Sequence, residues 1–170
     1  MKKVVLTIVA GISMQVAFAQ KAQLTSAILD FRNGKLDKAK TEIDNATNHA
    51  QTSKMSKTWF YRGEIYSAML ENPVYSKSAP ADAAKIAYDA YDKYLNMEGA
   101  KGEFSRTAAA KKDGMYGAIV NQGVASYNNK EYDKALANYK LASEMRPQDT
   151  TAFVYSIYAL ESKEDYAGAK

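Results

Sequence analysis

The 170-residue chain carries 23 Lys and Arg against 19 Asp and Glu and contains no cysteine. The lack of cysteine excludes disulfides, thiolate metal ligands and a cysteine nucleophile. Charges of opposite sign alternate along the chain without a basic block, which is typical of solvated helix surface and gives no indication of nucleic-acid binding. Only three prolines and nine glycines interrupt the sequence, and this composition favours an all-α fold.

Residues 1–19 have the pattern of a secretory signal peptide. A basic start over residues 1–3 precedes a mostly apolar run over residues 4–16, and Ala17-Phe18-Ala19 forms a small-x-small cleavage site. The alternative is a membrane anchor, but the apolar run is shorter than the ~20 residues that a spanning helix needs. We therefore expect export, cleavage before Gln20, and a mature chain over 20–170 that does not span the membrane.

Two helix pairs are predicted in the first half of the mature chain. The first covers about 20–53, with a turn at Asn33-Gly34, because both residues tolerate a positive φ. The second covers about 56–99. Its two helices are separated by an insertion over 71–82, whose two prolines and several turn formers predict a loop. Because loop entropy grows slowly with length, we expect this loop to be dispensable for folding.

A third helix pair and part of a fourth are predicted in the second half. Residues 100–115 contain no turn cluster except Asp113-Gly114 and are interpreted as an extra helical segment. The third pair covers about 116–149, with its turn at Asn128-Asn129-Lys130 and a stop at Pro147. Residues 150–170 hold one helix and the beginning of another.

The spacing of small and aromatic residues repeats between these segments. Gly123, Tyr132, Ala135, Tyr139 and Ala142 define it in the third pair, and Tyr132 and Ala135 return 34 residues later as Tyr166 and Ala169. The first pair has the same spacing at Ala27, Leu36, Ala39, Ile43 and Ala46. The first helix of the second pair has it at Trp59, Gly63 and Tyr66.

This pattern resembles the tetratricopeptide repeat (TPR) family, whose period is roughly 34 residues. The resemblance implies a right-handed α-solenoid of about three and a half repeats, with peptides or proteins bound on the concave groove lined by the first helix of each pair. It also implies that six tyrosines lie in the core: Tyr66, Tyr91, Tyr127, Tyr132, Tyr139 and Tyr166.

Residues of the groove follow from the same resemblance. Tyr61, Tyr155 and Tyr158 fall on groove positions, where exposed tyrosines would be amphipathic anchors. The carboxylate clamp known in the family is incomplete, because Thr151 and Tyr155 stand where it has cationic residues. The candidate groove residues are Lys57, Phe60, Tyr61, Glu64, Asn121, Val124, Asn128, Tyr155 and Tyr158.

Nothing in the sequence indicates catalysis, a metal or another cofactor. His49 is the only histidine and falls near a helix end, and no nucleophile elbow or phosphate loop occurs. The chain is similar to exported TPR proteins of Gram-negative bacteria, which implies a periplasmic or envelope location. We expect a non-catalytic scaffold that binds a protein or peptide; the alternative is a glycan- or small-ligand-binding accessory protein with a tyrosine-lined groove.

The C-terminal end lacks most of its expected second helix. Phe153, Ile157 and Leu160 fall on positions that would face that helix, and a solenoid needs a polar cap at each end. Two interpretations stay open at this point. The chain is a piece of a longer repeat protein, or it self-associates through this end.

Overall fold

The computed structural model describes residues 22–163, and over this range the chain forms helices and turns with no strand. The all-α prediction is confirmed for this part of the chain. The predicted signal peptide lies outside the described residues, as do Tyr166 and Ala169.

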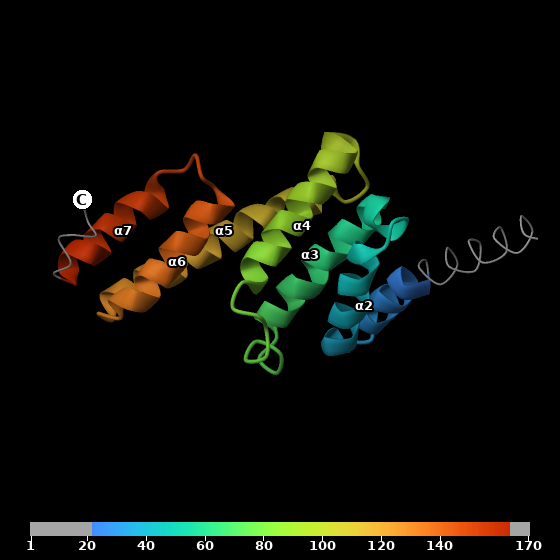
Figure 1. The fold of residues 1–170 in the computed structure, drawn as a ribbon, viewed down its shortest axis with the longest axis horizontal. Helices are drawn as coiled ribbons and strands as arrows, with labels where there is room; N and C mark the ends of the chain where they lie inside the picture. Colours follow the sequence, from blue (N-terminus) through green and yellow to red (C-terminus); the bar gives the residue numbers. More distant parts are fainter. Residues whose placement is uncertain (1–21, 164–170) are drawn as a thin grey trace, which may run out of the picture.

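Consecutive helices pack against one another in a row (Figure 1). The described range opens with helical residues 22–32. The helices that follow are α2 (Leu36–Asn48), α3 (Ser56–Glu71), α4 (Ala83–Glu98), α5 (Ser105–Asn128), α6 (Tyr132–Met145) and α7 (Thr151–Ser162), with short 3-10 turns at Thr52–Lys54 and Gly99–Lys101.

The turns before α2 and α6 have the same geometry, as the sequence predicted. Gly34 has φ 72° and Lys130 has φ 61°, so both lie in the left-handed region. The Gly34 amide donates to the Phe31 carbonyl at 3.0 Å, and the Lys130 amide donates to the Tyr127 carbonyl at 2.9 Å. In each turn the next amide reaches the carbonyl five residues earlier, which completes the glycine-type helix end.

Lys130→Gly is expected to raise the free energy of unfolding by up to about 1 kcal/mol, because a left-handed φ is costly for a side chain with a Cβ. Gly34→Ala should lower it by a similar amount, since a Cβ at Gly34 meets nothing within 4 Å and only the backbone strain is tested. Urea unfolding followed by circular dichroism measures both changes. A loss of stability in Lys130→Gly would contradict the prediction.

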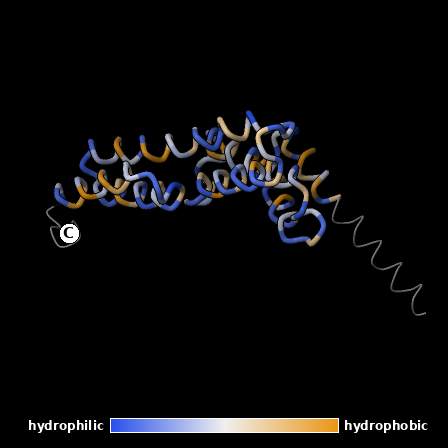
Figure 2. The backbone as a smooth tube through the Cα atoms, turned by 90° about the horizontal axis from the view of Figure 1, so that it is seen from above, coloured by the Kyte–Doolittle hydropathy of each residue, from blue (hydrophilic) through white to orange (hydrophobic). Residues whose placement is uncertain are grey.

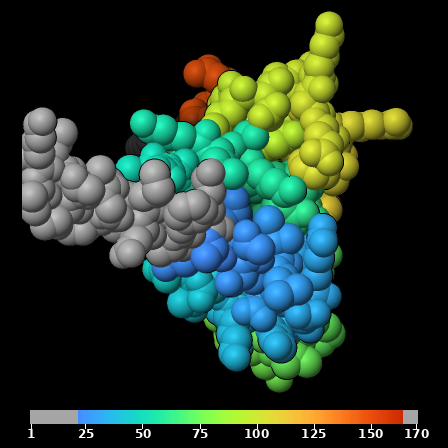
Figure 3. Space-filling model, turned by 90° about the vertical axis from the view of Figure 1, so that its right-hand side faces the viewer, coloured from blue at the N-terminus to red at the C-terminus, as the bar shows by residue number. Residues whose placement is uncertain are grey.

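The predicted insertion is a chain of turns between α3 and α4, although Glu71 still belongs to α3. The Tyr75 hydroxyl donates to the Gly34 carbonyl at 3.1 Å, and Ala79 packs against the core. Seen from the N-terminal end, the green loop emerges beneath the blue first hairpin (Figure 3). Because the loop is tied to the first turn, its deletion should cost that hydrogen bond, about 1 kcal/mol, and that the loop is dispensable for folding stays a prediction.

The buried side chains form two clusters joined by α5. The first lies among residues 22–32, α2, α3, α4 and the beginning of α5, where Ala108 is fully buried. The second lies among the end of α5, α6 and α7, and Ala84 and Tyr88 of α4 reach into it. In Figure 2, hydrophilic and hydrophobic positions alternate along the tube.

Helix α5 therefore does more than open the third pair. The predicted extra segment and the predicted first helix of that pair form one helix of 24 residues, which runs through Asp113-Gly114 without a turn. Its first half packs on α3 and α4, and its second half packs on α6 and α7. Because α5 and the segment before it pack on α3, they cover some of the predicted groove residues and leave others accessible.

Candidate functional site

The predicted groove residues of α3 are largely buried. Phe60 is 5% exposed and Tyr61 is 7% exposed, so the prediction that they line an open groove is wrong. The cause is Phe104, just before α5, which stacks on Phe60 with ring centroids 4.2 Å apart and an interplanar angle of 14°. Phe104 and Phe31 also contact the Tyr61 ring edge to face. Lys57 remains exposed, with its ammonium 5.8 Å from the centroid of the Tyr61 ring.

Glu64 is held by the chain itself. The Tyr91 hydroxyl donates to Glu64 Oε1 at 2.8 Å, and Lys111 Nζ lies 2.9 Å from the same oxygen. The Ser67 hydroxyl is 3.1 Å from the Tyr91 hydroxyl. These contacts join α3, α4 and α5, so the Glu64 carboxylate ties helices together and is not open to a ligand, contrary to the sequence prediction.

Tyr91→Phe is expected to reduce the loss in the free energy of unfolding that occurs as pH rises into the alkaline range. Burial first, and then the Glu64 carboxylate, raise the pKa of Tyr91 above its ordinary value. Above about pH 10 the unfolded chain ionises this tyrosine while the folded chain does not, so its contribution is intact at lower pH and falls by about 1.4 kcal/mol per pH unit as pH rises. Urea unfolding between pH 9 and 11 measures the slope, and an unchanged slope in Tyr91→Phe would contradict this.

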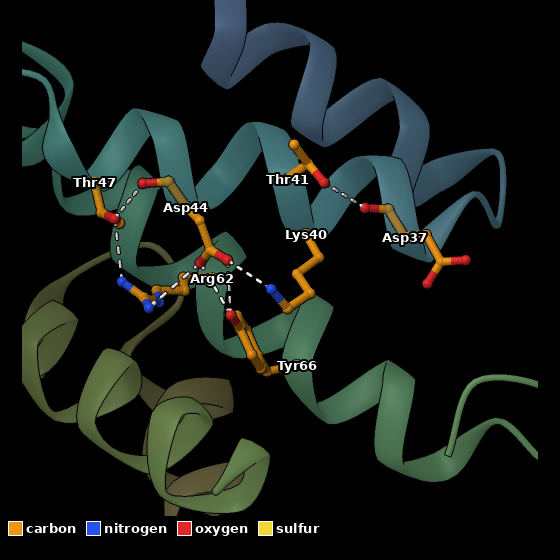
Figure 4. Close-up of polar contacts among 7 residues, drawn as sticks. All are labelled: Asp37, Lys40, Thr41, Asp44, Thr47, Arg62 and Tyr66. Atoms are coloured by element: carbon orange, nitrogen blue, oxygen red, sulfur yellow. Dashed lines mark hydrogen bonds and ion pairs between the residues drawn. The ribbon is translucent and has the colours of Figure 1, made fainter. Parts of the chain in front are cut away.

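A second polar cluster ties α2 to α3 (Figure 4). Asp44 accepts hydrogen bonds from the Tyr66 hydroxyl at 2.9 Å and from Lys40 Nζ at 3.0 Å, and it lies 3.3 Å from an Arg62 nitrogen. Arg62 also donates to the Thr47 hydroxyl at 3.1 Å. The hydrogen bond from Lys40 to Asp44 raises the pKa of Lys40 despite partial burial. The Asp44 carboxylate contacts three side chains from α2 and α3, which indicates a structural tie between these helices.

Four predicted groove residues meet at one pocket between α5, α6 and α7. Val124 and Asn128 come from α5, and Tyr155 and Tyr158 come from α7. The pocket has a volume of ≈ 230 Å³. Tyr158 is 52% exposed and Tyr155 is half-buried. Asn121 is exposed on α5 outside the lining of this pocket.

Two further tyrosines complete the pocket and had been assigned to the core. Tyr139 of α6 is 2% exposed, as predicted, and its ring centroid lies 5.6 Å from that of Tyr155. Tyr127 is only half-buried, and its hydroxyl lies 2.8 Å from the Ser162 hydroxyl. The prediction that Tyr127 is a core residue is met in part, because its ring packs against the second buried cluster, while Ser126, one residue earlier, is buried more completely. Tyr132, also predicted as core, is half-buried and packs against Tyr127 with centroids 5.7 Å apart.

Two of the larger hollows have fewer features of a binding site. One of ≈ 520 Å³ between Ala81-Asp82 and α6 has no aromatic side chain in its lining. Another of ≈ 660 Å³ surrounds the turn after α6 and has Tyr88 as its only ring. Known binding sites combine apolar and aromatic walls with a few convergent polar groups. The pocket lined by Val124, Tyr127, Asn128, Tyr139, Tyr155 and Tyr158, here named the tyrosine pocket, fits that description best.

Metal clusters and membrane-spanning helices are both absent from residues 22–163. No three His, Asp or Glu side chains of this range lie close enough together to hold a metal ion. His49 directly follows the last residue of α2, in agreement with the prediction that it falls near a helix end. None of the helices in this range combines the length and the apolar character needed to cross a bilayer.

Comparison of the chain with protein-family models and with curated proteins gives no match.

On the last helix of the described range, Phe153 is 63% exposed, while Ile157 and Leu160 are partly buried. Self-association through this surface stays a prediction, which sedimentation of the purified chain would test.

Proposed function

We propose that the chain is an exported TPR-type α-solenoid that binds a peptide or an extended segment of a partner protein on the surface of α5 and α7, without catalysis of its own. The observation that carries this proposal is the convergence of four predicted groove residues, from two helices far apart in sequence, on the tyrosine pocket. The repeated contact of a tyrosine with a glycine in the second and third hairpins supports the repeat interpretation: Tyr91 meets Gly63, and Tyr139 meets Gly123.

The dimensions of the tyrosine pocket favour one side chain of a longer ligand. Its ≈ 230 Å³ is below the ~300–1,000 Å³ of pockets that enclose a whole small molecule. Exposed amides at Asn121 and Asn128 lie on the same helix and suit hydrogen bonds to a peptide backbone. Tyr155 and Tyr158 offer rigid amphipathic contact area at low entropic cost.

Selection from a library of displayed random peptides tests the proposal. The chain should enrich related peptides, and Tyr158→Ala should lose at least tenfold in affinity for them. Tyr75→Ala is the matched control, because it removes a tyrosine from the loop that contacts the first turn. Enrichment that is equal for Tyr158→Ala and the unchanged chain would exclude the tyrosine pocket. Binding on a glycan array without enriched peptides would support the alternative, a glycan-binding accessory protein.

Export to the periplasm or envelope of a Gram-negative bacterium is part of the proposal. The small-x-small pattern that ends at Ala19 supports it. Expression of the full gene product in such a bacterium, followed by N-terminal sequencing of the periplasmic fraction, should give a protein that begins at Gln20. A cytoplasmic protein that retains Met1 would contradict this.

A further inference from the structure

We infer that the tyrosine pocket selects a basic side chain, taking the ammonium of a lysine or the guanidinium of an arginine from the partner segment by cation–π contact. The inference rests on the proposed function and names the chemistry of the group that the pocket takes.

The walls of the pocket are aromatic and uncharged. Four of its six lining residues are tyrosines, which come from three different helices, and the other two are Val124 and Asn128. The electron-rich faces of such rings attract cations, and several rings around one site add their effects. The Asn128 carbonyl and the tyrosine hydroxyl oxygens can accept hydrogen bonds from an ammonium or guanidinium group.

Other aromatic rings of this chain are covered by its own cations. Lys93 Nζ lies 3.6 Å from the ring centroid of Trp59, the Arg146 guanidinium lies 4.1 Å from that of Tyr116, and Lys112 Nζ lies 5.0 Å from that of Tyr88. Within residues 22–163, lysine and arginine side chains lie over the rings of Trp59, Tyr61, Tyr66, Tyr88 and Tyr116, none of which lines the tyrosine pocket. We expect a partner to supply the cation for the four rings of the tyrosine pocket.

Two helix carboxyl ends and one carboxylate lie near the pocket, together with the amino end of α6, which begins at Tyr132 and carries a partial positive charge. Asn128 is the last residue of α5, and Ser162, whose hydroxyl is paired with Tyr127, is the last residue of α7. The carboxyl end of a helix carries a partial negative charge, so two such ends flank the pocket. Exposed Glu161 follows Tyr158 by three residues on α7 and adds a carboxylate near the rim. The nearby Lys163 is paired with Asp133 at 2.7 Å.

Two isosteric probes separate a cation site from an apolar one. Choline and 3,3-dimethylbutan-1-ol have the same shape, but only choline is charged. In a titration of the purified chain followed by NMR of tyrosine ring resonances, choline should bind about tenfold more tightly, the ratio that corresponds to about 1.4 kcal/mol. Tyr158→Leu should abolish the difference and Tyr158→Phe should keep it, because the ring face and not the hydroxyl carries the attraction. Tyr75→Leu serves as the distant control.

The outcomes distinguish this inference from the proposed function. Equal binding of the two probes, or binding of neither, overturns the inference, whereas the proposed function still stands if displayed peptides depend on Tyr158. In such peptides, replacing each Lys or Arg in turn with Met should reveal one position where affinity falls about tenfold. A peptide that binds through the pocket and tolerates every one of these replacements also overturns the inference. If no peptide depends on Tyr158, the proposed function fails whatever choline does.

Discussion

Tyr139→Ala is expected to lower the free energy of unfolding by about 3–5 kcal/mol, the cost of truncating a fully buried aromatic side chain. Tyr139 is 2% exposed, belongs to the second buried cluster and packs against Tyr155. It also fills the space beside Gly123, where no other side chain replaces it. Because single domains are stable by only about 5–15 kcal/mol, this one substitution should remove a large part of the total.

Two variants make this prediction specific to burial. Tyr139→Phe keeps the ring and should cost little, because the Tyr139 hydroxyl makes no hydrogen bond with another residue of the described range. Tyr158→Ala removes a side chain that is 52% exposed and should change stability by no more than about 0.5 kcal/mol, while it weakens ligand binding. Urea denaturation gives all three values. Equal losses for Tyr139→Ala and Tyr158→Ala would show that the pocket rim belongs to the core.

Local features of the fold could be predicted because each depends on a few neighbouring residues. The turn at Gly34 follows from a residue that tolerates a positive φ. The turn at Lys130 follows from its position, which corresponds to that of Gly34 in the repeat spacing. The stop of α6 before Pro147 follows from the missing amide of proline. The small residues at Gly63 and Gly123 mark where the two helices of a hairpin cross, and the structure shows which tyrosine each one meets.

The burial of Phe60, Tyr61 and Glu64 could not be predicted in the same way. Their spacing places them on the open surface of a regular repeat, and α3 alone gives no sign that another segment covers them. Residues 100–115 were correctly expected to be largely helical, but where a helix packs depends on contacts distant in sequence. Phe104 stacks on Phe60 across 44 residues of chain, and Lys111 reaches Glu64 across 47. Four of the predicted groove residues therefore lie together only on α5 and α7, and that they bind a ligand stays a prediction.

Gly123→Ala is expected to lower the free energy of unfolding by about 1–3 kcal/mol, although alanine is the better helix former. A Cβ at Gly123 would lie 2.7 Å from Cδ1 of Tyr139, closer than side-chain atoms approach one another, so the ring must move. Gly117 lies in the same helix, and a Cβ there meets nothing within 4 Å. Gly117→Ala should therefore raise stability by about 0.5–1 kcal/mol, the helix propensity alone.

The first hairpin indicates a variant that should rescue Gly123→Ala. Ala27 and Ile43 are separated by the same 16 residues as Gly123 and Tyr139, and both are fully buried. In the first hairpin, Ala27, which is one methyl larger than glycine, is thus paired with Ile43, which is smaller than tyrosine. The double variant Gly123→Ala, Tyr139→Ile should cost at least about 1 kcal/mol less than the sum of the two single variants, because residues in contact do not act additively. Additive losses in urea unfolding would show that the two positions do not set each other's size, and that the spacing shared by the two hairpins has another cause.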